Sequence, residues 1–197
     1  TQRIPENKDG GLTSIDDREL AKRLAVFIWS SVPDTPLMKL SESGKLNEPE
    51  TLKAEVKRML ADSRSNRFSQ HFVEQWLGLD GMESVTHVTD VALKEAMQKE
   101  PVAFFDDLLK RNGSVFDFIH SDYALVNERL AKHYGIRDVL GSRFRKVSIE
   151  PHINRGGLLT GSAVLAMNSD GKDSNPLKRG VWMLESILDD PPPPPPP

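Results

Sequence analysis

Apolar residues recur at intervals of three and four along most of this 197-residue chain, and that interval is the period of an α-helix with one buried face. Leu20, Leu24 and Ile28 follow this period in the first segment, and Phe72 and Trp76 follow it in the fourth. The last segment has an apolar stripe at the same period: Leu177, Val181, Leu184 and Leu188. Proline or glycine ends most segments, because proline cannot continue a helix and glycine favours the cap that closes one. We therefore expect a mainly α fold, an irregular multi-helix bundle with at most one or two short strands and a C-terminal polyproline II tail.

Capping residues and helix breakers divide the chain into separate helices. Ser14 and Thr35 are the predicted caps of the first two helices, Asn47 begins the third, and Asn127 caps a later one. The predicted helices span residues 14–31, 35–44, 47–60, 62–77, 89–111, 115–119, 127–135, 157–167 and 176–188. Pro101 lies inside one of them and predicts a kink or two abutting helices. Residues 144–149 alternate between apolar and polar and predict the only strand, for which the sequence shows no partner.

Composition excludes several classes of function. The net charge is −3 and 28% of the residues are charged, so nothing draws the chain as a whole toward nucleic acid or an anionic membrane. No apolar run approaches the roughly 18–20 residues of a membrane-spanning helix. Residues 1–11 lack the pattern of a signal peptide and predict a mature or truncated end. There is no cysteine, which excludes disulfides, Cys-ligated zinc, covalent haem attachment and a thiol nucleophile within these residues.

An unbroken proline run, Pro191 to Pro197, follows the last helical segment. Proline fixes φ and lacks an amide donor, so the run can form only an extended polyproline II rod of about 3.1 Å per residue. A rod with nothing beyond it separates nothing. We therefore expect that the chain is one part of a longer protein, cut inside a linker, and that residues beyond it supply the chemistry.

The residue types that perform most enzyme chemistry form no recognised constellation. None of the five histidines has the spacing of a paired metal site: His71, His87, His120, His133 and His152. His152, beside Asn154 and Arg155, is the best candidate of this set. His133 lies at a helix end, where a cation suits the helix dipole.

Adjacent carboxylates and the central serine favour ordinary structural roles. Side chains that are neighbours in a helix point about 100° apart, so Asp16–Asp17, Asp106–Asp107 and Asp189–Asp190 are typical of solvated faces and not of a catalytic dyad. Ser162, between Gly161 and Ala163, lacks the second glycine of a nucleophile elbow. The sequence alone therefore assigns no reaction.

Two arginine–glycine turns and the aromatic residues complete the candidates. After Arg155, Gly156 and Gly157 allow close backbone approach at a helix start, where free amides can hold an anion or a cofactor propionate; ordinary turn geometry is the alternative that the sequence favours. Gly180, after Arg179, lies inside the last predicted helix, where glycine is unfavourable. The expected reason for a glycine at this position is a neighbouring backbone that passes close by. The three tryptophans and six methionines fall where core packing is the expected role, although methionine can also be an axial haem ligand: Trp29, Trp76, Trp182, Met38, Met59, Met82, Met97, Met167 and Met183.

An ordered set of motifs resembles a known family. The set is similar to tandem domains of unknown function that are abundant in large exported, cytochrome-associated proteins of planctomycetes. The motifs of the first, helical domain are residues 23–34 (RLAVFIWSSVPD), 57–64 (KRMLADSR), 75–79 (QWLGL) and 121–136 (SDYALVNERLAKHYGI), and those of the companion domain are 155–160 (RGGLLT), 175–182 (NPLKRGVW) and the proline run. The resemblance implies an N-terminal extension at 1–13, a helical domain at 14–150, the start of the companion domain at 151–190 and a truncated polyproline linker at 191–197.

The resemblance also implies a context for these domains. In the family the proline run leads to a segment with a Cys-x-x-Cys-His motif for haem c, which this chain lacks. It implies no cofactor within the chain itself, an extracytoplasmic location, and partners that comprise the downstream domain and a redox partner, with neither nucleic acid nor a membrane span. Arg155, Arg179 and Trp182 are the expected contacts to a downstream haem. No catalytic residue or metal ligand transfers, so enzymatic activity stays open.

Three functions remain open at this point. The first is a helical scaffold that supports electron transfer by the downstream haem, through burial and hydrogen bonding that tune it. The second is a structural or interaction module of a secreted protein, with the proline rod presented to a partner. The third, carbohydrate hydrolysis, requires two carboxylates about 5–10 Å apart in a pocket, and no pattern places such a pair together.

Overall fold

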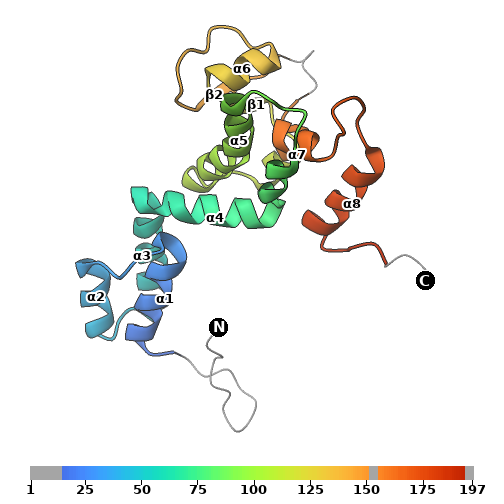
Figure 1. Ribbon diagram of the computed structural model, residues 1–197. Coiled ribbons are helices and arrows are strands. Elements are labelled where there is room, and N and C mark those ends of the chain that lie inside the picture. Colours follow the sequence, from blue (N-terminus) through green and yellow to red (C-terminus); the bar gives the residue numbers. More distant parts are fainter. Residues whose placement is uncertain (1–14, 151–154, 194–197) are drawn as a thin grey trace. The chain divides into compact units, whose positions relative to one another are not determined.

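The computed structural model describes residues 15–150 and 155–193, and in this part it is mainly helical, with one two-stranded antiparallel sheet (Figure 1). The predicted fold class is thereby confirmed. Packing divides the chain into two compact units, unit 1 before Ser69 and unit 2 from Ser69 onward. This boundary lies within a helix and reflects packing, not the division into sequence domains. The domains predicted from the sequence, 14–150 and 151–190, therefore stay predictions. Pro191–Pro193 form neither helix nor strand, while residues 1–14, 151–154 and 194–197, which include most of the proline run, lie outside the described residues.

Unit 1 is a small helical unit with its own apolar core. It contains α1 (Asp17–Trp29), α2 (Thr35–Glu42), α3 (Pro49–Ala61), the short 3-10 helix η1 (Ser63–Ser65) and the start of α4 (Asn66–Leu77). Its fully buried apolar side chains come from α1, α2, α3 and the α2–α3 loop: Ala21, Ala25, Ile28, Trp29, Leu37, Leu46 and Met59. Ile28, Leu37 and Met59 follow from the helical period of the sequence and Trp29 from its expected role in the core, whereas Ala21, Ala25 and Leu46 were not predicted.

The helix caps of unit 1 differ from the predicted ones. Asp16 caps α1, since its Oδ1 accepts a hydrogen bond from the Glu19 amide at 2.8 Å; the predicted cap Ser14 is outside the described residues. Asp34 caps α2 instead of Thr35. The third helix begins at Pro49, two residues after Asn47. In the predicted helix 62–77, Asp62 is extended and the next three residues form η1, so α4 begins only at residue 66.

Unit 2 contains most of the secondary structure. It comprises the rest of α4, η2 (Leu79–Ser84), α5 (Val91–Lys110), η3 (Val115–Phe118), β1 (Tyr123–Val126), α6 (Glu128–Tyr134), β2 (Arg145–Ser148), η4 (Leu158–Thr160), α7 (Ser162–Met167) and α8 (Pro176–Ser186). Helix α5 runs through Pro101 as one element of 20 residues, so the chain does not divide into two helices there. Figure 1 shows α7 beside α5 within this unit.

The two strands form an antiparallel pair in which Tyr123 lies opposite Ser148 and Val126 opposite Arg145. The sequence predicted β2 but missed its partner. All four residues of β1 are buried, and a short continuous apolar run has no alternation that distinguishes a strand from a helix turn. The prediction of a single strand without a partner is therefore wrong.

Two predictions near the C-terminal end are also corrected. The small-residue segment 157–167 is not one helix, because the chain is extended at Gly161, between η4 and α7. Helix α8 starts at Pro176 as predicted, but its apolar stripe is not buried: Leu177 is 82% and Leu188 56% exposed. The helix instead packs through Trp182, which is partly buried against the core of unit 2. In the described part, no helix is long and apolar enough to cross a membrane.

Candidate functional site

A buried carboxyl group, that of Glu100 on α5, is the centre of a polar cluster in unit 2. Its Oε2 accepts hydrogen bonds from the Tyr134 hydroxyl at 2.6 Å, the Ser162 amide at 3.1 Å and the Ser162 hydroxyl at 3.0 Å. The Tyr134 hydroxyl also accepts from the Ser162 amide at 2.9 Å. The Glu100 cluster, defined as Glu100, Tyr134 and Ser162, therefore cross-links α5, α6 and α7.

The cluster exists because α7 has no cap of its own. The first amides of a helix have no partner inside the helix, and Gly161 at the cap position supplies no side chain. Glu100 and Tyr134 supply the missing acceptors from two other helices. Helix α7 is thus capped only when it lies against α5 and α6.

Burial sets the protonation of this cluster. Desolvation raises the pKa of Glu100, and the hydrogen bonds from Tyr134 and Ser162 offset that effect only in part. Burial, followed by the charge of Glu100, raises the pKa of Tyr134. The neutral forms of both groups are favoured, because an unpaired charge in an apolar interior is costly.

Arg155 lies over the same cluster. Its guanidinium is 4.0 Å from the centre of the Tyr134 ring, and its Nη1 donates to the Thr160 carbonyl at 3.0 Å. Arg155, Glu100 and Tyr134 help to line a small cavity of about 20 Å³. A cavity of this size has room for about one water molecule.

The predicted close approach at Gly156 and Gly157 is confirmed, but the neighbour is the chain's own backbone. An added Cβ at Gly156 would be 1.9 Å from the Ser121 carbonyl oxygen, and one at Gly157 would be 2.6 Å from the Phe118 carbonyl oxygen. The Gly156 amide donates to the Thr160 hydroxyl, and the Gly157 amide donates to the Ser121 hydroxyl at 3.0 Å. Both amides are thus used within the chain, which favours ordinary turn geometry over an anion or propionate held there, and the expected contact of Arg155 with a downstream haem stays a prediction.

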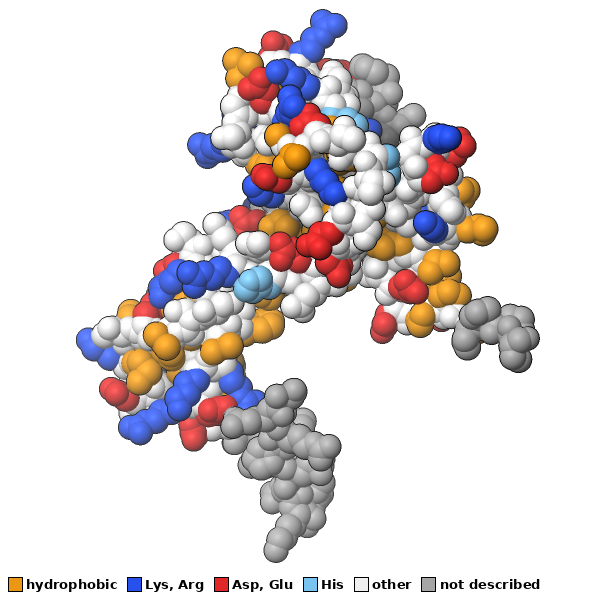
Figure 2. Space-filling view, viewed as in Figure 1, with side chains coloured by type: hydrophobic (Ala, Val, Ile, Leu, Met, Phe, Trp, Pro, Cys, Tyr) orange, Lys and Arg blue, Asp and Glu red, His pale blue; other side chains and the backbone are white. Residues whose placement is uncertain are grey.

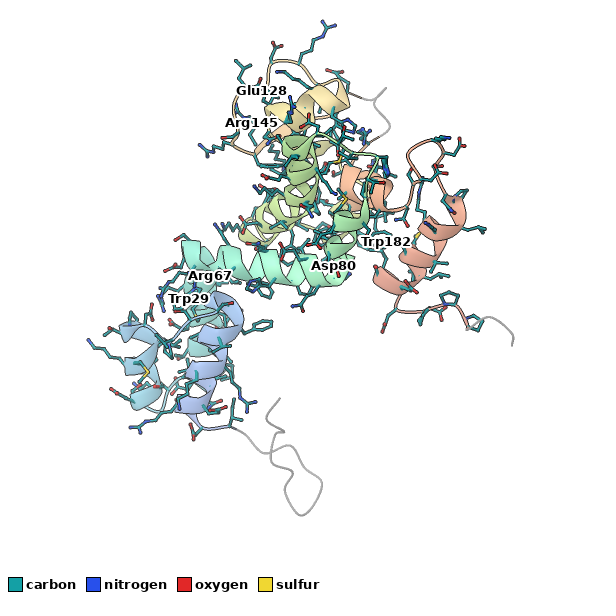
Figure 3. The ribbon with its side chains drawn as sticks, in the orientation of Figure 1. Trp29, Arg67, Asp80, Glu128, Arg145 and Trp182 are labelled. Atoms are coloured by element: carbon teal, nitrogen blue, oxygen red, sulfur yellow. The ribbon has the colours of Figure 1, made fainter. Side chains whose placement is uncertain are left out.

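Two tryptophans join α4 and α8 by reciprocal hydrogen bonds. The Trp76 indole donates to the Ser186 carbonyl at 2.6 Å, and the Trp182 indole donates to the Leu77 carbonyl at 3.1 Å (Trp182 is labelled in Figure 3). Both side chains are partly buried against the core of unit 2, as expected for core packing. They fix α8, the last helix before the proline run.

Arg179 and Gly180 differ from expectation. An added Cβ at Gly180 would meet nothing within 4 Å, so the predicted neighbouring backbone is absent among the described residues. The Nε atom of Arg179 is buried and has no hydrogen-bond partner in that part of the chain. Arg155 and Trp182 have the partners named above, and these contacts do not join the two residues to each other.

Among the residues that the structure describes, the histidines and adjacent carboxylates do not converge on one site. Burial, followed by the charge of Arg155, lowers the pKa of His133, which favours a neutral ring and not the expected cation. His152 lies outside the described residues. Asp106 accepts from Ser69 and pairs with Lys110, whereas Asp107 pairs with Arg111, so the two adjacent carboxylates serve different partners. Over residues 15–150 and 155–193, no group of three or more His, Cys, Asp or Glu could hold a metal ion.

Unit 1 has a second cluster, built around Trp29. The Trp29 indole is fully buried and donates to the Met59 carbonyl at 2.9 Å, and the Arg64 guanidinium lies 3.5 Å from its ring centre. Asp34 accepts two hydrogen bonds from Arg58 and one from Arg64, all at 3.0–3.1 Å. These residues come from the motifs at 23–34 and 57–64, so both motifs build one internal cross-link.

Comparison with known families identifies two matches along the chain. The model of the PSD4 family, described as a protein of unknown function (DUF1592), matches residues 15–136. The chain belongs to the PSD4 family. Residues 155–197 match PSCyt3, also described as a protein of unknown function (DUF1588), and this tandem order is that of the planctomycete-type cytochrome-associated family. No curated protein and no solved structure matches the chain.

The PSD4 and PSCyt3 segments share one core. Glu100 and Tyr134 belong to the PSD4 match, and Ser162 to the PSCyt3 match. Both tryptophan hydrogen bonds also join a PSD4 residue to a PSCyt3 residue. Leu158, Ala163 and Ala166 of the PSCyt3 segment lie in the same apolar cluster as the buried residues of α4, α5 and β1: Val73, Leu77, Ala96, Met97, Phe104, Tyr123, Ala124, Leu125 and Val126.

The name PSCyt3 points to cytochromes, so the fit of a haem was considered. The chain has no cysteine and cannot form the thioether bonds of haem c. The cavity at Arg155 is about 20 Å³, whereas cofactor pockets measure about 300–1,000 Å³. A larger hollow of about 720 Å³ in unit 2 is lined mainly by polar and acidic side chains, which do not suit a porphyrin: Gln70, Glu74, Gln75, Leu79, Asp80, Glu83, Glu95, Gln98, Lys99 and Val102. Neither hollow suits a haem, and this chain has no cysteine to which haem c could be attached.

One sequence pattern points to the Glu100 cluster. Glu100 lies between Met97 and Phe104 on the buried side of its helix, and a charged residue is rare at such a position unless it has partners. Its partner Tyr134 was placed only at a helix end, and Ser162 was considered only as a nucleophile. The contact between them depends on tertiary packing.

Proposed function

We propose that the chain is the scaffold portion of an extracytoplasmic, c-type-haem-associated protein, and that it supports electron transfer by a haem in the downstream segment. The observation that carries this proposal is the double attachment of the PSCyt3 segment, by the Glu100 cluster and by the Trp76–Trp182 pair. These contacts fix the helix that precedes the proline run. The segment that carries a downstream haem would then begin at a fixed point on the surface of unit 2.

The chemistry of the described side chains supports a scaffold. Glu100, Tyr134, Ser162 and Arg155 use their polar atoms in internal contacts, as do the charged residues around Trp29. Arg179 differs, because its buried Nε lacks a partner in the described part. Among the three expected haem contacts, Arg179 thus has a buried donor that is free for a group that packs against α8. The extracytoplasmic location rests on haem c attachment, which takes place outside the cytoplasm.

The experiment uses the natural full-length protein, whose reduced-minus-oxidised spectrum should show a c-type haem. Arg179→Lys and Trp182→Phe should shift the haem midpoint potential, whereas Arg18→Lys, at an exposed position of unit 1, should leave it unchanged. A full-length protein without haem would refute the redox proposal. Unchanged potentials in both variants would refute the supporting role of these residues.

The second candidate function is a structural or interaction module of a secreted protein with no redox role. The exposed apolar side chains of α8 favour it, since Leu177 and Leu188 are available to a partner. A haem-free natural protein that binds a partner through α8, with binding lost in Leu177→Ser, would support this function over the first.

A further inference from the structure

A cationic hollow of about 460 Å³ lies beside β2 in unit 2. It is lined by three basic residues, one carboxylate and two apolar residues: Arg143, Arg145, Lys146, Asp107, Leu125 and Phe144. Its size is within the range of small-molecule sites. Nothing in the scaffold role uses it.

The positive charge of this hollow is largely uncompensated. The Arg143 side chain has no ion-pair or hydrogen-bond partner among the described residues. Arg145 donates to a neutral group, the Leu140 carbonyl. Lys146 is 3.9 Å from Asp107, but that carboxylate has a closer partner, the Arg111 Nε at 2.9 Å. Two guanidinium groups and an ammonium group thus share Asp107, which Arg111 already engages, and Lys146 also acts on Asp117, a second partner of Arg111.

The surrounding segment reinforces this charge. Residues 127–149 contain six basic and two acidic residues, a net charge of +4, in a chain whose net charge is −3. Figure 2 shows Lys and Arg side chains that protrude at the end of unit 2 formed by α6 and β2. The field in the hollow is therefore positive although the chain as a whole is acidic.

We propose that this hollow binds a doubly charged tetrahedral oxyanion, a phosphate or sulfate group. The guanidinium fork matches such oxygens with paired hydrogen bonds, and an ammonium group adds a further donor. Lys146 is preorganised, because its Nζ lies 3.6 Å from the centre of the Tyr123 ring. Phe144 and Leu125 form an apolar wall that suits a carbon body attached to the anion. The negative charge of the rest of the chain disfavours a long polyanion such as nucleic acid.

The test is a titration of the chain at low ionic strength, followed by amide NMR. Inorganic phosphate or sulfate should shift the amides of residues 141–147 in a saturable way, and the monovalent acetate ion should bind several-fold more weakly. Arg143→Ala with Arg145→Ala should weaken binding about tenfold, because two charge-assisted contacts are lost. The matched control is Lys22→Ala, which removes an exposed charge in unit 1 and should have no effect.

Further variants make the outcome decisive. Arg143→Lys with Arg145→Lys keeps the charge but removes the forks, so its affinity should lie between those of the wild type and the alanine variant; this pair also serves if the alanine variant does not fold. Glucose 6-phosphate, whose phosphate ester is doubly charged above about pH 7, distinguishes the sources: tighter binding than inorganic phosphate supports an ester with its carbon body on Phe144, and equal or weaker binding supports the free ion. Absence of saturable shifts at 141–147, or unchanged affinity in the alanine variant, would overturn the proposal.

Discussion

Replacement of Glu100 by glutamine should stabilise the chain at neutral and alkaline pH and flatten the pH dependence of its stability. The glutamine carbonyl oxygen can accept the bonds that Oε2 accepts from Tyr134 and Ser162, without a buried charge. Because burial raises the pKa of Glu100 above its unfolded value, the folded state binds this proton more tightly. Its contribution to stability is therefore fully present below the unfolded pKa and is lost as pH rises toward the folded pKa.

The magnitude follows from linkage. Between the unfolded and the folded pKa, one extra bound proton changes the free energy of unfolding by about 1.4 kcal/mol per pH unit. The wild type should lose stability at that slope relative to Glu100→Gln as pH rises from about 4.5. Above the folded pKa the difference should be constant.

The assay is urea unfolding of the whole chain at a series of pH values, with tryptophan fluorescence and helical circular dichroism as probes. Glu95→Gln is the matched control, because Glu95 is an exposed residue of the same helix, with 60% of its side chain accessible. A Glu100→Gln variant with the wild-type slope, or one that is less stable than the wild type at every pH, would refute the reasoning.

The other predictions concern glycines and tryptophans. Gly156→Ala should lower the free energy of unfolding by several kcal/mol or prevent folding of unit 2, because Gly156 has φ +132° and its new Cβ would overlap the Ser121 carbonyl. Gly180→Ala should instead raise the free energy of unfolding by about 0.5–1 kcal/mol. Thermal unfolding of both variants tests this, and equal effects would contradict it. Trp182→Phe should lower the free energy of unfolding in urea by about 0.5–1.5 kcal/mol and speed amide exchange in α8. Unchanged exchange in α8 would argue against a stabilising hydrogen bond from Trp182 to α4. Trp29→Phe should cost about 1–3 kcal/mol, since it removes a fully buried hydrogen bond and part of a ring; a loss below about 0.5 kcal/mol in urea unfolding would contradict this.

The helices could be predicted from sequence because their information is local. Periodic apolar residues and breakers such as Pro33, Gly44 and Gly78 act within a turn or two, and they predicted the helical segments from α1 to α6 within a few residues. The caps were less certain, because Asp16 and Asp34 compete with Ser14 and Thr35 for the same role. Strand β1 had no local signal, since a buried strand depends on its partner 22 residues later at β2.

The candidate site could be predicted only in its parts. Arg155, Gly156 and Gly157 were singled out correctly as a place of close backbone approach, but the sequence does not say that the approaching backbone is that of residues 118–121. The contact between Glu100 and Ser162 spans 62 residues and depends on how α5 and α7 pack. The prediction that the apolar stripe of α8 is buried was wrong for the same reason. Periodicity predicts that a helix has an apolar face, and only tertiary packing decides whether that face is covered.

Native-state hydrogen exchange of the whole chain tests most directly whether residues 155–186 complete the core of unit 2. The amides of Gly157 and Ser162, which donate to Ser121 and Glu100, should exchange with the same opening free energy as the amides of β1. If the amides of 155–186 exchange almost as fast as in an unfolded chain while β1 stays protected, the PSCyt3 segment is not part of this core, and the account is wrong.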